Sequence, residues 1–121
     1  RKLNNNKKMD CNILNSLFKR TENKVSRSYI GSDCYAYKNS EDQSITIRFI
    51  NVNILTYYKN KTFSSDSSKE RTNTIKRKIN LFCPLGFSLH SKKGEWIWND
   101  GRKYSDKEVK KCMNIKDIKC T

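Results

Sequence analysis

The five cysteines of this chain could form disulfides, bind a metal or remain free thiols, and their spacing helps to choose among these roles. They lie at Cys11, Cys34, Cys83, Cys112 and Cys120. A structural zinc site is typical of Cys-x-x-Cys or histidine pairs, whereas these intervals are long and His90 is the only histidine. The spacing therefore favours disulfides in a secreted domain, and we expect no metal and no cofactor. An odd count leaves one cysteine as a free thiol, as a link to another chain, or as the partner of a residue in a trimmed segment.

The residues that could act as catalysts are few. A ribonuclease of the pancreatic type needs two histidines as acid and base, and catalysis by a cysteine with His90 needs a reduced, activated thiol beside it. Glu95 and Asp100 form a conceivable glycosidase pair, but they flank a turn and are typical of a solvated hairpin end. We expect that the protein is not an enzyme, and we keep a secreted hydrolase such as a ribonuclease as the third alternative.

A strong positive charge is the clearest indication of a partner. Lys and Arg number 26 against 12 Asp and Glu, for a net charge of +14. Such a charge opposes folding by self-repulsion and attracts polyanions. The predicted anion-binding residues are Lys69, Arg71, Lys76, Arg77, Lys78, Lys107, Lys110 and Lys111. Sulfated or sialylated glycans, anionic lipid and nucleic acid all suit a basic surface, and outside the cell a glycan or an acidic protein is the simplest candidate.

Two tryptophans give the second candidate surface. Trp96 and Trp98 are two residues apart, so in a strand both side chains lie on one face. The default expectation is that at least one packs in the core beside Phe82 and Phe87. If the face is exposed instead, the two rings and Arg102 form a partner-binding spot of hot-spot composition.

These side chains need a small scaffold to position them. At 121 residues we expect a basic arm over 1–8 and one disulfide-braced domain over 9–121. The fold class we predict is α+β and β-rich, an antiparallel sheet or sandwich with one or two short helices. No stretch approaches the ~20 apolar residues of a membrane span.

Hydrophobic periodicity predicts the elements. We expect helices over 10–20 and 106–113, the latter with Ser105 as its N-cap and Glu108 at its third position. Turns are expected at 31–33, 91–94 and 99–101, and an exposed loop over 59–73. The strands we expect are 34–37, 44–58, 74–83, 86–90 and 95–98. The phase of alternation reverses between Phe49 and Ile50, which predicts a bulge or bend within the strand over 44–58. In a strand over 74–83, Lys76 and Lys78 would point to one side and Arg77 to the other.

One resemblance lies in the C-terminal third. Cys83-Pro84-Leu85-Gly86-Phe87-Ser88-Leu89, then Gly94-Glu95-Trp96 and Cys112, resemble the second half of a complement control (sushi) module. No cysteine lies between Leu89 and Trp96, and the stretch over 44–74 would be an insertion. The resemblance implies a small β-rich domain with disulfides Cys34–Cys112 and Cys83–Cys120, which leaves Cys11 unpaired.

A second resemblance is to C-type-lectin-like domains. The stretch Gly94-Glu95-Trp96-Ile97-Trp98-Asn99-Asp100-Gly101 is similar to the Trp-rich strand and turn of that fold. This resemblance implies a Cys112–Cys120 pair. The calcium motif of sugar-binding members is missing, so it implies recognition of a protein without calcium.

The function that we predict is recognition outside the cell. Asn60-Lys61-Thr62 is an N-glycosylation sequon, which fits a surface loop of a secreted protein. We expect a secreted or cell-surface binding module that recognises a host or partner macromolecule: an extracellular protein, or a sulfated or sialylated glycan, with nucleic acid a lesser candidate. The alternative is a basic cytokine-like or toxin-like effector.

Overall fold

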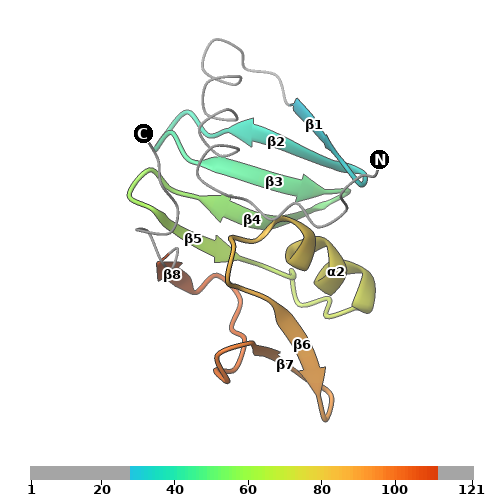
Figure 1. Ribbon diagram of the computed structural model, residues 1–121. Helices are drawn as coiled ribbons and strands as arrows, with labels where there is room; N and C mark the ends of the chain where they lie inside the picture. The colour runs from blue at the N-terminus through green and yellow to red at the C-terminus, as the bar shows by residue number, and fades with distance from the viewer. Residues whose placement is uncertain (1–27, 112–121) are drawn as a thin grey trace, which may run out of the picture.

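The structure is a computed structural model that describes residues 28–111 and has an antiparallel sheet at its centre (Figure 1). The main sheet has six strands in the order β1-β2-β3-β4-β5-β8, and β6 and β7 form a separate hairpin. The bounds are β1 Ser28–Gly31, β2 Cys34–Lys38, β3 Ile45–Phe49, β4 Val52–Tyr57, β5 Thr62–Ser65, α2 Asn73–Phe82, β6 Leu89–Lys92, β7 Glu95–Trp98 and β8 Val109–Lys111. The prediction of a β-rich α+β fold with an antiparallel sheet and a short helix is confirmed. The expected arm over 1–8 and helix over 10–20 lie outside the described residues.

The core lies between one face of the main sheet, α2 and the β6–β7 hairpin. Tyr57 and Phe63 of the sheet, Ile79 of α2 and Trp98 of β7 are each 1% exposed or less. Asn80 holds α2 to the hairpin, because its side chain accepts from Leu89 N at 2.6 Å and donates to Leu89 O at 2.8 Å. Figure 1 shows α2 against the sheet, with the hairpin below it. The side chains of the core face are thus committed to packing, and any ligand has to use other surfaces.

The prediction of one bent strand over 44–58 is wrong. Two strands, β3 and β4, pair antiparallel and are joined by a turn at Ile50 and Asn51. Ile50 has a φ of 54°, which is unfavourable for a β-branched residue. The turn contains no glycine, which is the residue that usually identifies such a hairpin in a sequence, so this sign of a turn is missing here. The reversed phase of the apolar pattern comes from the change of strand direction.

The prediction of a strand over 74–83 is also wrong, because this segment is helix α2. Its buried residues are Ile75, Ile79 and Phe82, which recur at the i, i+4, i+7 spacing of one helix face. Thr72 caps the helix, and its side chain accepts from Ile75 N at 3.2 Å. The expected alternation fails at Arg77, where a strand would need an apolar residue.

Two further corrections concern the edge of the sheet. The loop expected over 59–73 contains β5, in which Phe63 is fully buried. The helix expected over 106–113 is replaced by β8, which pairs with β5. Asp106 does not begin a helix, because its carboxylate accepts from the backbone N–H and the hydroxyl of Ser67, both at 2.9 Å. That long-range contact fixes the approach to β8 in extended form.

Several local predictions are confirmed. Residues 34–38 form β2, with a turn before it at Ser32 and Asp33. The expected hairpin is present with other bounds: β6 begins at Leu89 rather than at residue 86, and Lys92 pairs with Glu95, so the turn is Lys93 and Gly94 rather than 91–94. No helix among residues 28–111 has the length and apolar character needed to cross a bilayer.

The expected disulfide brace is not present among residues 28–111. Cys34 and Cys83 are both buried, and they are not joined to each other. Cys11, Cys112 and Cys120 lie outside the described part of the chain. The pairings Cys34–Cys112, Cys83–Cys120 and Cys112–Cys120 therefore stay predictions.

Candidate functional site

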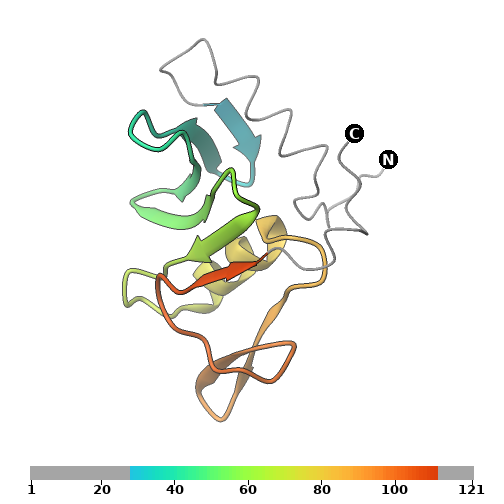
Figure 2. The same cartoon turned by 90° about the vertical axis from the view of Figure 1, so that its left-hand side faces the viewer.

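Helix α2 lies against one side of the main sheet (Figure 2). The other side, the outer face, carries polar and aromatic side chains from β2, β3 and β4. The register pairs Tyr35 with Arg48, and Arg48 with Asn53, so these three lie on one face. Their alternate neighbours on β2 and β3, Ala36 and Ile47, belong to the buried core, as alternation along a strand requires. On β4 a register shift opposite Ile47 and Arg48 lets both Ile54 and Leu55 face the core while Asn53 stays on the outside.

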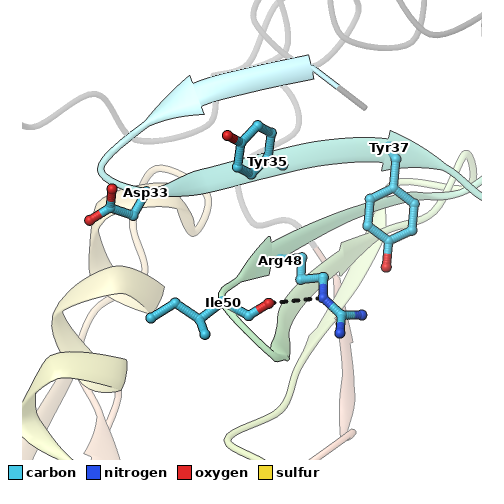
Figure 3. Close-up of a pocket in the computed structure, with 5 residues that line it drawn as sticks. All are labelled: Asp33, Tyr35, Tyr37, Arg48 and Ile50. Carbon is cyan, nitrogen blue, oxygen red and sulfur yellow. Dashed lines mark hydrogen bonds between the residues drawn. The ribbon is translucent and has the colours of Figure 1, made fainter. Parts of the chain in front are cut away.

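A hollow of about 440 Å³ opens on this face (Figure 3). Its lining within residues 28–111 consists of Asp33, Tyr35, Tyr37, Arg48 and Ile50. Asp33 comes from the β1–β2 turn and Ile50 from the β3–β4 turn, while the other three lie on β2 and β3. The hollow is therefore built on paired strands, which hold side chains more rigidly than loops do.

Hydrogen bonds fix the polar groups of the hollow. Arg48 donates from Nε to the Ile50 carbonyl oxygen at 3.0 Å and from Nη1 to Asn53 Oδ1 at 3.3 Å. The Tyr37 hydroxyl donates to the same Asn53 oxygen at 3.1 Å. The ion pairs within residues 28–111 involve Arg71, Arg102 and Lys103, and none involves Arg48. The hollow thus contains a positioned guanidinium without a carboxylate partner from the described chain.

A second hollow of about 320 Å³ extends the outer face toward β5 and β8. Its lining includes Asn53, Thr56, Tyr58 and Lys107. Asn53 lies in this lining and is bonded to Tyr37 and Arg48 of the first hollow. The two hollows are therefore neighbours, and together they suit an extended ligand.

The predicted anion-binding residues do not form one patch. Lys76, Arg77 and Lys78 lie on α2, where Arg77 is exposed, Lys76 donates to Ser91 Oγ at 2.8 Å, and the Lys78 Nζ lies 5.1 Å from the Phe49 ring centroid. Successive residues of a helix point in directions about 100° apart, so these three side chains point in three different directions. The prediction that Lys76 and Lys78 lie on one side of a strand and Arg77 on the other is therefore wrong.

The remaining predicted basic residues lie around β8 and the segment before α2. Lys110 pairs in register with Phe63, and its Nζ is 5.6 Å from the Trp98 ring centroid. Lys107 lines the second outer hollow. Lys69 and Lys111 are exposed. Because β8 takes the place of the helix predicted over 106–113, Lys107, Lys110 and Lys111 do not lie together on one helix face.

Arg71 contacts other residues of the protein, although its side chain is 43% exposed. Its Nη2 lies 3.5 Å from Asp106 Oδ2, and its guanidinium carbon lies 5.0 Å from the Tyr104 ring centroid and 5.7 Å from that of Trp96. Desolvation works against the Asp106 carboxylate, but hydrogen bonds from Ser67 and Tyr104 and the charge of Arg71 hold its pKa below the usual value. These contacts make Arg71 a poor candidate for ligand binding.

The tryptophans belong to the core, as the default expectation had it. Trp96 is 4% exposed and Trp98 1%, and the Trp98 ring centroid lies 5.7 Å from that of Phe87. Phe82 belongs to the same core. The two rings therefore offer no exposed surface for the predicted partner-binding role. Arg102, the third residue of that prediction, is exposed, and its Nε lies 3.9 Å from Asp100 Oδ2.

The residues considered as catalysts are His90, Glu95 and Asp100, and the two carboxylates form ion pairs at the surface. His90 is exposed on β6. Glu95 lies 3.6 Å from Lys103, and Asp100 pairs with Arg102. Within residues 28–111 no group of three His, Cys, Asp or Glu side chains is placed to hold a metal ion.

Asn60 lies in the exposed turn between β4 and β5. Its Oδ1 accepts from Thr62 N at 3.2 Å and from Thr62 Oγ1 at 2.6 Å. The sequon is thus on the surface, as a glycan acceptor must be.

Sequence reasoning missed the outer-face hollow. The available signal was the alternation over Cys34–Lys38 and Ile45–Phe49, which places Tyr35, Tyr37 and Arg48 at the polar positions of two strands. Their convergence depends on pairing between strands. Comparisons of the chain with protein-family models, with curated proteins and with solved structures find no match. The sushi-like and C-type-lectin-like resemblances accordingly rest on the sequence pattern alone.

Proposed function

We propose that the protein is a secreted or cell-surface binding module that recognises a host or partner macromolecule, with its basic residues assisting the encounter. The observation that carries this proposal is the outer face of the sheet, where two hollows adjoin and Arg48 has no carboxylate partner among the described residues. A few convergent polar groups in an aromatic-lined hollow are typical of binding sites.

The distribution of positive charge favours long-range attraction of an acidic partner over a single basic docking patch. Lys69, Arg77, Lys107 and Lys111 are exposed on different parts of the surface, and the net charge of the chain is +14. Charges spread in this way raise the rate of encounter with an acidic partner. The partner class that fits is an extracellular protein or glycan with acidic groups.

The test is the salt dependence of association. Binding to immobilised heparin, a generic acidic glycan, is followed by surface plasmon resonance from about 50 to 500 mM salt, a range over which the Debye length falls from beyond 10 Å to below 8 Å. We expect the association rate to fall steeply with salt and the dissociation rate to change less. Binding that is indifferent to salt contradicts the proposed role of the charge.

A charge-reversal variant makes this test specific. Lys69, Arg77, Lys107 and Lys111 are changed to Glu together, because all four are exposed. Association should slow several-fold with the melting temperature nearly unchanged. The matched control reverses Lys38, Lys92, Lys93 and Lys103, of which Lys92 and Lys93 lie at the β6–β7 turn. The net charge is then equal in both variants, so a larger effect of the first set shows that position matters.

An extracellular location and a disulfide brace are part of the same proposal. A secreted chain should carry a glycan at Asn60, which is exposed, and disulfides are expected in a small secreted domain. Expression through a eukaryotic secretory pathway, followed by intact-mass measurement, should show a glycan that Asn60→Gln removes. A secreted chain of unmodified mass at Asn60 contradicts glycosylation at this site.

A further inference from the structure

The Arg48 guanidinium is held so that one end is available to a ligand. Its Nε is bonded to the Ile50 carbonyl oxygen and its Nη1 to Asn53. Nη2 has no hydrogen-bond partner among residues 28–111, and Nη1 has a second hydrogen to donate. Nη1 and Nη2 are the pair that binds a carboxylate end-on with two parallel hydrogen bonds. The anchored Nε keeps this end in place, which reduces the side-chain entropy lost on binding.

Asn53 supplies a donor next to that end. Its Oδ1 accepts from both Tyr37 and Arg48, so the hydrogen-bond network fixes the orientation of the amide. The Nδ2 group is thereby turned away from these two residues, and Asn53 is exposed. An amide held in this way donates to a ligand hydroxyl or carboxylate oxygen beside the guanidinium.

Aromatic and apolar surface completes the hollow. The Tyr35 and Tyr37 rings line it together with Ile50, whose side chain is 67% exposed. Figure 3 shows the Tyr37 ring and the Arg48 guanidinium on the same side of the paired strands. A pyranose ring presents C–H groups on one face and hydroxyls around its edge. It therefore suits a hollow that combines ring faces with a few polar groups.

The charge of Asp33 favours a sugar over a nucleic-acid strand as the ligand of this hollow. Asp33 lines the hollow together with Arg48, which is the one basic residue in that lining among residues 28–111. The Asp33 carboxylate repels the repeated phosphates of a single strand, and such strands are bound in grooves that are positive along their length. The same carboxylate accepts hydrogen bonds from sugar hydroxyls.

We propose that this hollow binds a carboxylated sugar residue, with its carboxylate on Nη1 and Nη2 of Arg48, its hydroxyls toward Asn53 Nδ2 and Asp33, and its C–H face on the tyrosine rings. The inference rests on the proposed function, because it names the chemical class of the macromolecule that the outer face recognises. Sialic acid and the uronic acids share this chemistry.

The experiment is an NMR titration of the isotope-labelled chain with small sugars. The probes are 3′-sialyllactose and an unsulfated heparosan tetrasaccharide, which distinguish the two sources of the carboxylate, and lactose is the neutral control. We expect one of the acidic probes, at roughly millimolar concentrations, to shift the Arg48 Nε and Asn53 Nδ2 resonances. Lactose should leave them unchanged.

Three variants test the geometry. Arg48→Lys keeps the charge but loses the two-pronged end, and Asn53→Asp keeps the oxygen that accepts from Tyr37 while it replaces the donor by a charge. Each should weaken binding about tenfold or more. Lys92→Arg, a change that keeps the charge at an exposed position of the β6–β7 hairpin, is the control and should bind as the parent does. Since Asn53 is exposed, its variant should fold even if Arg48→Lys does not.

The outcomes separate this inference from the proposed function. If neither acidic sugar shifts these resonances while heparin still binds in a salt-sensitive way, the carboxylated-sugar site is wrong and the binding module stands. If heparin and the sugars both fail, both proposals fall. If an oligouridine shifts Arg48 and Asn53 and the sugars do not, the outer face binds single-stranded nucleic acid instead.

Discussion

The Tyr57 hydroxyl donates a hydrogen bond to the Phe82 carbonyl oxygen at 2.5 Å, which joins the middle of the main sheet to the last residue of α2. Both side chains are buried. The bond satisfies a carbonyl at the C-terminus of the helix, where the last four carbonyls have no partner within the helix. It therefore determines how α2 seats on the core face of the sheet.

Changing Tyr57 to Phe tests that contact. The ring stays in place, but the Phe82 carbonyl loses its partner, at a cost of about 1–3 kcal/mol of unfolding free energy. Urea unfolding followed by tryptophan fluorescence measures the loss. Tyr58→Phe is the control, since its hydroxyl lies 3.3 Å from Ser64 Oγ at a partly exposed position. Equal effects of the two changes would contradict a special role for Tyr57.

Truncation of the tryptophans should be costly. Trp96→Ala and Trp98→Ala each remove a ring that contacts Tyr104, and we expect a loss of about 3–5 kcal/mol for each. Thermal melts by circular dichroism measure this loss. Trp98→Phe should cost less, because it keeps an aromatic ring and removes an indole N–H that is buried without a partner among residues 28–111. If both alanine variants melt like the parent but lose ligand binding, the rings would be a ligand platform and their assignment to the core would be wrong.

Acid should destabilise the fold partly through Asp106. The folded-state pKa of this carboxyl is below its unfolded value, so its contribution to stability is present above the unfolded pKa of about 3.9. That contribution is lost as the pH falls through the lower folded-state pKa. We expect Asp106→Asn to be less stable at neutral pH and to lose less stability on acidification than the parent.

The measurement is the urea midpoint between about pH 2 and pH 7. Part of the acid sensitivity should remain in the variant, because hydrogen bonds from Ser44 also lower the pKa of Asp42. Asp100→Asn is the control at an exposed carboxylate. If the acid limb of Asp106→Asn is as steep as that of the parent, Asp106 does not stabilise the fold as its contacts indicate.

Cys34 should be chemically inert in the folded protein. Burial raises the pKa of its thiol to about 11 and outweighs the nearby charge of Lys78, so little thiolate is present at neutral pH. Iodoacetamide at pH 8 should leave Cys34 unmodified in the native state and alkylate it in urea without reductant, as read by peptide mass mapping. Alkylation of native Cys34 would contradict its burial. Modification only after reduction would instead show a disulfide, as the sushi-like pairing with Cys112 requires.

The sequence by itself determined the features that depend on composition and on nearest neighbours. The net charge follows from composition. A strand that begins at Cys34, a hairpin that ends at Trp98 and the burial of Trp96 and Trp98 follow from alternation, turn residues and ring size, although β6 begins at Leu89 and not at residue 86. These signals are local, so they survive whatever the rest of the chain does. The β-rich α+β class was predictable for the same reason.

Only the tertiary structure decided the elements whose local signal was ambiguous. The segment Asn73–Phe82 is a helix because Ile75, Ile79 and Phe82 lie on one helix face and are buried in the core. Residues 109–111 form a strand because they pair with the free edge of β5, and the hydrogen bonds from Ser67 to Asp106 hold the preceding segment in place. The outer-face site arises in the same way: Tyr37, Arg48 and Asn53 are distant in sequence and meet through strand pairing. Pairing depends on register between distant segments, and a single sequence carries no direct record of that register.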